Sequence, residues 1–145
     1  MRTIRHIMVA TDGSEAANRA LDVAAAIIKA VDGELSILTV GEQLSGDQLR
    51  RLARAEGDIG DALESLSNRI IKQANDRARR LGVSPTKVQV AWGDPAEAIV
   101  QTAQREQIDA IAVGRRGRGK LARLLLGSVS QKVTTLAPCI VIVVP

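Results

Sequence analysis

The sequence contains almost none of the residue types that metal, disulfide and thiol chemistry require. Among its 145 residues there is one cysteine, Cys139, and one histidine, His6. These are too few for a disulfide framework or a zinc cluster, and a catalytic Cys–His pair would require both of them to converge. We therefore expect no resident metal and no thiol catalysis, and we interpret Cys139 as a small buried thiol.

Aromatic residues and long apolar runs are also scarce. Trp92 is the only aromatic residue, so the chain lacks the stacked aromatic side chains that bind single-stranded nucleic acid. No stretch approaches the ~20 apolar residues of a membrane-spanning helix, and the apolar part of the N-terminal segment is too short for a signal peptide. The net charge of +4 is modest for a dedicated nucleic-acid binder. We expect a globular cytoplasmic protein without a membrane span.

Short runs rich in β-branched residues alternate with longer amphipathic segments. The runs predict five strands, at Ile4–Ala10, Glu34–Val40, Thr86–Trp92, Ile108–Val113 and Cys139–Val144. The segments between them predict four helices, one capped by Ser14 and followed by Gly33, one over about Ile59–Leu81, one capped by Asp94 and one over about Ser128–Leu136. Residues 41–58 are polar and glycine-interrupted, and we expect a surface excursion there.

Strands that alternate with helices indicate a parallel sheet with right-handed crossovers and helices on both faces. We expect one α/β domain over residues 1–145. Two strand orders are common for such a chain, 2-1-3-4-5 and 3-2-1-4-5, and ligands bind these sheets at the carboxyl ends of strands where the winding direction reverses. The second order would place residues 11–14, "TDGS", beside residues 114–119, "GRRGRG".

The segment from Gly114 to Ser130 has the parts of an anion site. Gly114 directly follows the fourth predicted strand, and Gly117 comes three residues later. Gly127 and Ser128 lie at the start of the last predicted helix, where unpaired N–H groups and the helix dipole favour an anion. The first ten residues of the segment also carry five cationic side chains. The alternative interpretation is a glycine-rich connection in which Ser128 and Gln131 only cap a helix.

A P-loop is a second alternative for the same segment. Gly114, Gly119 and Lys120 satisfy the first seven positions of the pattern G-x-x-x-x-G-K-[ST], but the eighth position is Leu121. A P-loop needs a hydroxyl there to hold Mg²⁺, so the apolar residue removes a required ligand. We therefore reject the P-loop interpretation.

The spacing Gly114-x2-Gly117-x9-Gly127-Ser128 matches the signature G-2x-G-9x-G-[S/T] of nucleotide-binding universal stress proteins. The segments "IMVATDGSEAANRAL", "GDPAEAIVQTA" and "GRRGRGKLARLLLGSVSQKVTTLAPCIVIVVP" also resemble that family, so the similarity extends over nearly the whole chain except residues 41–58. The resemblance implies a Rossmann-like five-stranded parallel sheet of order 3-2-1-4-5, with an adenine nucleotide between the first and fourth strands. It also implies a nucleotide-responsive module in stress adaptation.

The same resemblance implies which residues contact the nucleotide. They are Ala10, Thr11, Asp12, Val40, Val113, Gly114, Arg116, Gly117, Gly127, Ser128, Val129 and Ser130. The Asp12 carboxylate would accept hydrogen bonds from the ribose or the base, and the main chain of Val40 would meet the adenine. The residues from Val113 onward would surround the phosphates of ATP, ADP or AMP, and any Mg²⁺ would be held by those phosphates.

The sequence favours binding over turnover. A phosphoryl-transfer enzyme needs a positioned nucleophile and a metal clamp, and Asp12 is the only carboxylate placed near the expected site. We expect slow or no ATP hydrolysis. Two other functions stay open, a polyanion or duplex binder that uses the cations of residues 115–120, and an interaction protein that binds no nucleotide.

The last predicted strand indicates an assembly. In either strand order it lies at an edge of the sheet, and "CIVIVV" has neither proline nor charge before Pro145. An apolar edge of this kind promotes aggregation unless it is covered. We expect a homodimer in which Ile140–Val144 pairs antiparallel with the same strand of a second copy across a two-fold axis.

Overall fold

The computed structural model describes residues 3–41, 50, 54, 59–115 and 127–145, and for residues 59–62 it describes the backbone only. The predicted surface excursion at residues 41–58 therefore lies outside the described residues, except for Gly41, Arg50 and Arg54.

Five strands and four helices alternate along the described chain. In order they are β1 (His6–Ala10), α1 (Glu15–Val31), β2 (Glu34–Val40), α3 (Ile59–Arg80), β3 (Lys87–Ala91), α4 (Pro95–Arg105), β4 (Ala110–Gly114), α5 (Ser128–Leu136) and β5 (Ile140–Val144). The strands form one parallel sheet of order β3-β2-β1-β4-β5. The predicted α/β fold and the strand order 3-2-1-4-5 are confirmed.

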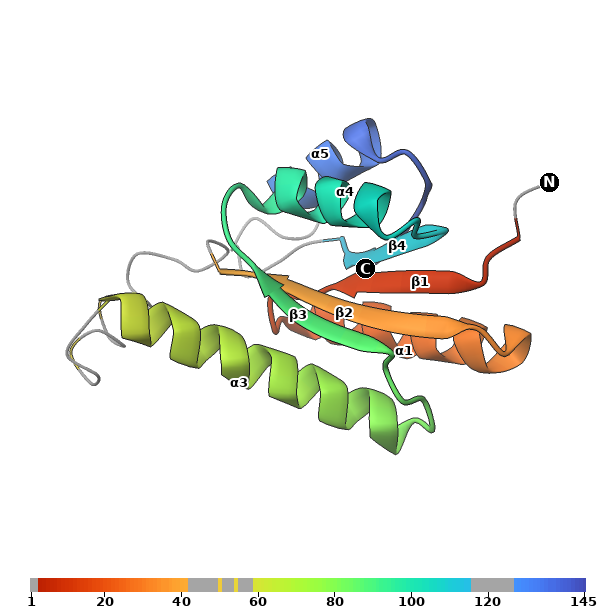
Figure 1. Ribbon diagram of the computed structural model, residues 1–145, viewed down its shortest axis with the longest axis horizontal. Coiled ribbons are helices and arrows are strands. Elements are labelled where there is room, and N and C mark those ends of the chain that lie inside the picture. Colours follow the sequence, from red (N-terminus) through yellow and green to blue (C-terminus); the bar gives the residue numbers. More distant parts are fainter. Residues whose placement is uncertain (1–2, 42–49, 51–53, 55–58, 116–126) are drawn as a thin grey trace.

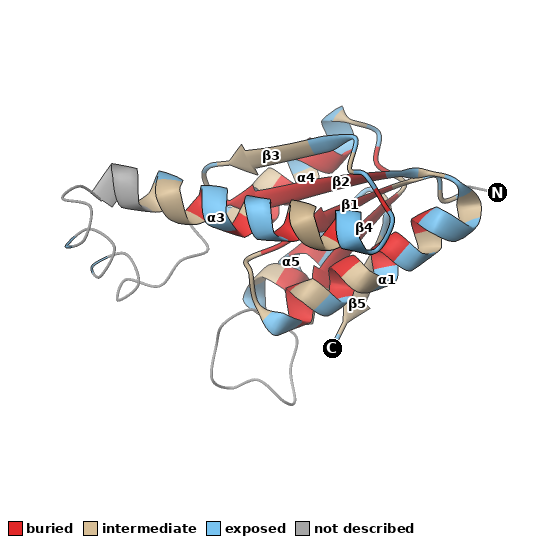
Figure 2. Ribbon diagram, turned by 90° about the horizontal axis from the view of Figure 1, so that it is seen from below, coloured by how far each residue is buried: buried red, intermediate tan, exposed pale blue. Residues whose placement is uncertain are grey.

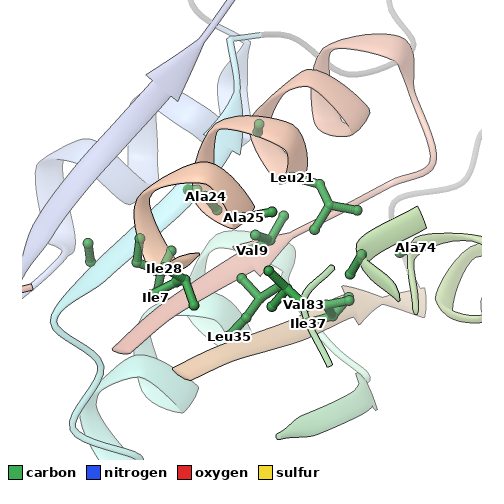
Figure 3. Packing of buried hydrophobic residues seen from close by; sticks show 14 residues of the cluster. Ile7, Val9, Leu21, Ala24, Ala25, Ile28, Leu35, Ile37, Ala74 and Val83 are labelled. Atoms are coloured by element: carbon green, nitrogen blue, oxygen red, sulfur yellow. The ribbon is translucent and has the colours of Figure 1, made fainter. Parts of the chain in front are cut away.

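The sheet is the middle of three layers. Figure 1 shows α4 and α5 on one face of the sheet and α1 and α3 on the other. Successive residues of a strand point to opposite faces, so Ile7 and Val9 pack with α1 and α3 while Met8 and Ala10 pack with α4 and α5. Figure 3 shows the first of these two cores, in which Leu21 and Ile28 of α1 lie over the strands.

Burial follows position in the sheet. After its first residue, each residue of β1 and β2 is buried, and so is each residue of β4 before Gly114, because neighbouring strands and helices cover them on all sides. The edge strands β3 and β5 are only partly buried, as the burial colours of Figure 2 show. Cys139, predicted to be buried, is only partly buried, because it precedes the edge strand β5.

The helix ends show which sequence signals were correct. Ser14 caps α1 by accepting a hydrogen bond from the N–H of Ala17 at 3.2 Å, and Asp94 caps α4 through the N–H of Glu97 at 3.0 Å. Gly33 lies just past α1, as predicted, and Asp32 before it adopts the left-handed conformation that is common at helix ends. A side chain at position 33 would strike the carbonyl of Arg5, so Gly33 is required for space. None of the described helices is long and apolar enough to cross a membrane.

Candidate functional site

The winding direction of the sheet reverses between β1 and β4. The two strands are hydrogen-bonded neighbours in which Ala10 pairs with Val113. The next residues, Thr11 just after β1 and Gly114 at the end of β4, therefore lie side by side. All strands are parallel, so their carboxyl ends meet at one edge, on the left of Figure 1. This is the edge at which α/β sheets bind ligands.

The turn after β1 is held by its own polar groups. The Thr11 N–H donates to the carbonyl of Leu38 at 2.9 Å, and the buried hydroxyl of Thr39 donates to the Thr11 carbonyl at 2.7 Å. The Thr11 hydroxyl accepts the N–H of Gly13, and the Asp12 carboxylate accepts the N–H of Ser14 at 2.9 Å. Asp12 thus takes part in an Asx-type turn that leads directly into α1.

Gly114 lets β4 approach the start of α1. A Cβ atom on this residue would lie 2.8 Å from the carbonyl carbon and the Cβ of Ala16 and from the nitrogen of Ala17. Two of these three atoms belong to the helix backbone, so no change of side-chain rotamer could relieve the contact. The glycine at this position is therefore required by the packing of β4 against α1, whatever the ligand.

Two hydrogen bonds hold the amino terminus of α5 at the end of β4. The N–H of Gly127 donates to the carbonyl of Arg115 at 2.8 Å, and the buried hydroxyl of Ser130 donates to the carbonyl of Gly114 at 2.6 Å. The Arg115 N–H in turn donates to the carbonyl of Val144, the last residue of β5, at 2.6 Å. Residues 115 and 127 are thus neighbours, although 11 residues separate them in the sequence.

The amino terminus of α5 has no side-chain cap. Gly127 occupies the N-cap position, so the N-cap residue has no side chain that could accept a hydrogen bond from the first turn, and Ser128 is already helical and exposed. The alternative in which Ser128 caps the helix is therefore wrong. Uncapped N–H groups and the positive end of the helix dipole favour an anion at this position.

The structure brings most of the predicted site residues to one edge. Those that surround the β1–β4 junction are Ala10, Thr11, Asp12, Val113, Gly114, Gly127, Ser128, Val129 and Ser130. Val40 lies one strand further along the same edge, at the end of β2. Arg116 and Gly117 lie outside the described residues.

Charged side chains link the helices beside this edge. Lys132 of α5 approaches Asp94 to 3.2 Å and Glu97 to 3.8 Å, so the start of α4 is tied to α5. The hydrogen bond from the Glu97 N–H and the contact with Lys132 lower the pKa of Asp94. Within the described residues, no group of three or more histidine, cysteine, aspartate or glutamate side chains could hold a metal ion.

His6 lies at the opposite edge of the sheet, as the first residue of β1. Its Nε2 is 2.5 Å from the hydroxyl oxygen of the buried Ser36. The histidine is therefore packed at the amino end of the sheet and does not face the site.

Sequence reasoning missed two features of this edge. One is the packing of Gly114 against α1, because no local signal in the sequence indicates which helix packs against a glycine at a strand end. The other is the contact of Trp92, just after β3, with Gly41, just after β2. The sequence signal for this contact was the only aromatic residue of the chain, placed at a strand end.

Comparison with known proteins identifies similar chains over the full length. The model of the universal stress protein family matches residues 3–145. A universal stress protein of Thermus aquaticus is 37% identical over 138 residues, which cover 95% of this chain and 96% of the relative. The universal stress protein YxiE of Bacillus subtilis (strain 168) is 33% identical over 154 residues, which cover 95% of this chain and 97% of the relative.

Solved structures show the same fold. The crystal structure of a universal stress protein in complex with cAMP matches with a TM-score of 0.71 and 30% sequence identity, and the match covers 97% of each chain.

Proposed function

Because the chain belongs to the universal stress protein family, we propose that it binds an adenine nucleotide, ATP foremost, between β1 and β4. We propose further that it acts as a nucleotide-responsive module in stress adaptation. The observation that carries the proposal is the uncapped amino terminus of α5, held beside the Thr11–Ser14 turn by the hydrogen bond from Ser130 to Gly114. The complex of a 30% identical family member with cAMP supports an adenine nucleotide as the ligand class.

The two sides of the site suit the two ends of a nucleotide. The first-turn N–H groups of α5 would donate to the phosphates, with a contribution from the helix dipole of about 0.3–2 kcal/mol. On the other side, the Asp12 carboxylate would accept from the ribose hydroxyls, and the main chain of Val40 would meet the adenine. The glycine at position 114 would let the phosphates approach the backbone at the strand end.

We expect the bound nucleotide to be held and not turned over at an appreciable rate. The described residues offer no cluster that could hold Mg²⁺, so the ion would be carried by the phosphates. Asp12 is the one carboxylate in the turn after β1, and its Oδ1 already accepts the N–H of Ser14. The described part of the site therefore supports binding through hydrogen bonds and charge, and within it we identify no general base.

We also propose that two copies pair through β5. This strand forms one edge of the sheet, its residues are at most partly buried, and Ile140 is 40% exposed. Among the described residues, no strand pairs with its outer edge. Antiparallel pairing across a two-fold axis would satisfy these backbone groups and cover the apolar side chains. A monomeric mass in sedimentation at micromolar concentration would contradict this pairing.

The nucleotide proposal is tested by placing a negative charge where the phosphates are expected. Ser128→Asp puts a carboxylate in the first turn of α5, where it is favourable for the helix but repels a phosphate. Ser128→Asn is the matched neutral control. For the wild type, saturating ATP at about 100 times Kd should raise the stability by about 2.7 kcal/mol, seen as a higher thermal midpoint.

Ser128→Asp should abolish this ATP-dependent rise, and Ser128→Asn should retain most of it. Mass spectrometry of the small molecules released by heat denaturation would identify the nucleotide that co-purifies. An unchanged wild-type midpoint in saturating ATP would overturn the proposal. If the protein instead binds duplex DNA, and Ser128→Asp leaves that affinity unchanged, the polyanion alternative is favoured.

A further inference from the structure

Trp92 is a large apolar side chain left open at the edge of the site. It follows β3 directly, so it lies at the same carboxyl edge as the turn after β1. It is 52% exposed, more than any other large hydrophobic residue in the described part of the chain. Burying an exposed aromatic side chain against a ligand is favourable, because its large apolar surface leaves water.

The indole is nevertheless seated on the backbone of the neighbouring strand end. β2 and β3 pair with Val40 opposite Ala91, which brings Gly41 alongside Trp92. The six-membered ring of the indole lies so close to Gly41 that a Cβ on this residue would overlap its Cζ3 and Cε3 atoms. Because Gly41 has no side chain, the indole can lie directly against its backbone, while about half of the surface of Trp92 remains exposed.

The register along the edge places Trp92 where a base would end. Neighbouring strands lie about 4.8 Å apart, so β3 is roughly 10 Å from β1, with the end of β2 between them. In the proposed function the phosphates lie at α5, on the β4 side, and the nucleoside extends from Asp12 across the end of β2. The end of the base that lies farthest from the phosphates would then face the indole of Trp92.

We infer that Trp92 is a specificity-determining residue that packs against the adenine ring of the bound nucleotide and thereby closes the site on the β3 side. This assignment rests on the proposed function and adds to it the contact that selects the base. An indole stacks well on a planar aromatic ring, and β3 lies on the far side of β1 from β4 and the expected phosphates, so the effect of Trp92 should depend on the base alone.

The experiment compares ligands with and without the base. Affinities for ATP and for inorganic tripolyphosphate are measured by isothermal titration calorimetry for the wild type, Trp92→Leu and Trp92→Phe. Leu81→Ala is the matched control, because Leu81 is also an exposed apolar residue but lies just past α3, at the opposite edge of the sheet. Since the chain has no tyrosine, phenylalanine or second tryptophan, its intrinsic fluorescence reports on Trp92 alone.

We expect ATP to change the Trp92 emission of the wild type. Trp92→Leu should weaken ATP binding by on the order of tenfold to a hundredfold, the usual effect of removing an aromatic ring that stacks on a base. Its affinity for tripolyphosphate should equal that of the wild type, which also shows that the variant is folded. Trp92→Phe should retain most of the ATP affinity, and Leu81→Ala should leave the affinities for ATP and for tripolyphosphate unchanged.

The assignment of Trp92 would be overturned if the wild type binds ATP without a change in Trp92 emission and Trp92→Leu binds ATP as tightly as the wild type. The proposed nucleotide binding would still stand in that case. A parallel loss of ATP and tripolyphosphate binding in Trp92→Leu would also overturn it, because the residue would then act through the fold. If the wild type binds no adenine nucleotide, the proposed function fails and the assignment fails with it.

Discussion

Replacing Gly114 by alanine tests how β4 and α1 together build the site. The new Cβ would lie 2.8 Å from three atoms of Ala16 and Ala17. Carbon atoms pack best at about 3.5–4.0 Å, so the start of α1 must withdraw by roughly 0.7–1.2 Å. Overpacking of this kind costs about 1–3 kcal/mol. For a chain of this size, each kcal/mol lowers the thermal midpoint by about 2–4 °C, so a decrease of about 2–12 °C is expected.

The same displacement should weaken nucleotide binding. The first turn of α1 follows the Thr11–Ser14 turn, and Ser14 both caps the helix and belongs to that turn. Movement of α1 therefore separates the two sides of the proposed site. Losing one hydrogen bond to a charged group costs about 1.5–3 kcal/mol, which predicts at least a tenfold loss of ATP affinity for Gly114→Ala. Thermal unfolding and calorimetric titration measure the two effects.

Two control variants separate this mechanism from a general loss of stability. Gly82 has φ +87° at the far end of α3, so Gly82→Ala should cost about 1–2 kcal/mol through backbone strain but leave ATP affinity unchanged. Adding Ala16→Gly to Gly114→Ala removes only one of the three close contacts, and it should restore little of the stability. Wild-type stability of Gly114→Ala, or full rescue by Ala16→Gly, would refute the backbone contact as the cause.

Two further predictions concern a hydrogen bond and an ion pair. Ser130→Ala removes the donor to the Gly114 carbonyl. The thermal midpoint should fall by the equivalent of about 1 kcal/mol, and the ATP affinity should fall as well. Unchanged ATP affinity would show that this hydrogen bond does not position α5. Hydrogen bonds from Arg77 to Asp22 at 2.7 and 2.8 Å hold the pKa of the Asp22 carboxyl below its ordinary value. A lowered folded-state pKa stabilises the protein above the unfolded value of about 3.9 and ceases to do so as the pH falls through the folded value. Asp22→Asn should therefore lower the free energy of unfolding by about 0.5–1 kcal/mol at neutral pH, as expected for a partly exposed pair. In thermal unfolding, the difference between the variant and the wild type should shrink below about pH 4. A stability difference that persists there would contradict the ion pair as its source.

Much of the fold was readable from local pattern. The predicted bounds of β2 match the structure, and so do the predicted last residues of β1 and β5. The remaining strand ends differ from the structure by one or two residues. Ser14 and Asp94 cap their helices as expected, because a cap depends on residues only three positions apart. Local pattern did not reveal the effect of distant groups. The carbonyl of Arg5 leaves no room for a side chain at position 33, and Asp32 takes the left-handed position at the end of α1.

The candidate site divides in the same way. The spacing of Gly114, Gly127 and Ser128 indicated a phosphate site, and the structure places these residues together at the end of β4. The predicted contacts of Arg116 and Gly117 stay predictions, since these residues lie outside the described chain. The homodimer through β5 also stays a prediction, because one chain shows only that this edge is open.

The sequence by itself determined the alternation of strands and helices, the apolar character of the inner strands and the family signature, since each depends on residues close together in the chain. The alternation of elements left two strand orders open, and the tertiary structure confirmed the one that the family resemblance implied, and with it which strands are neighbours at the carboxyl edge. Tertiary structure alone decided that Gly114 packs on α1, that Ser130 holds α5 to β4 and that Trp92 is seated on Gly41. These contacts join segments from 16 to about a hundred residues apart, and such segments become neighbours only when the strands assemble into the sheet.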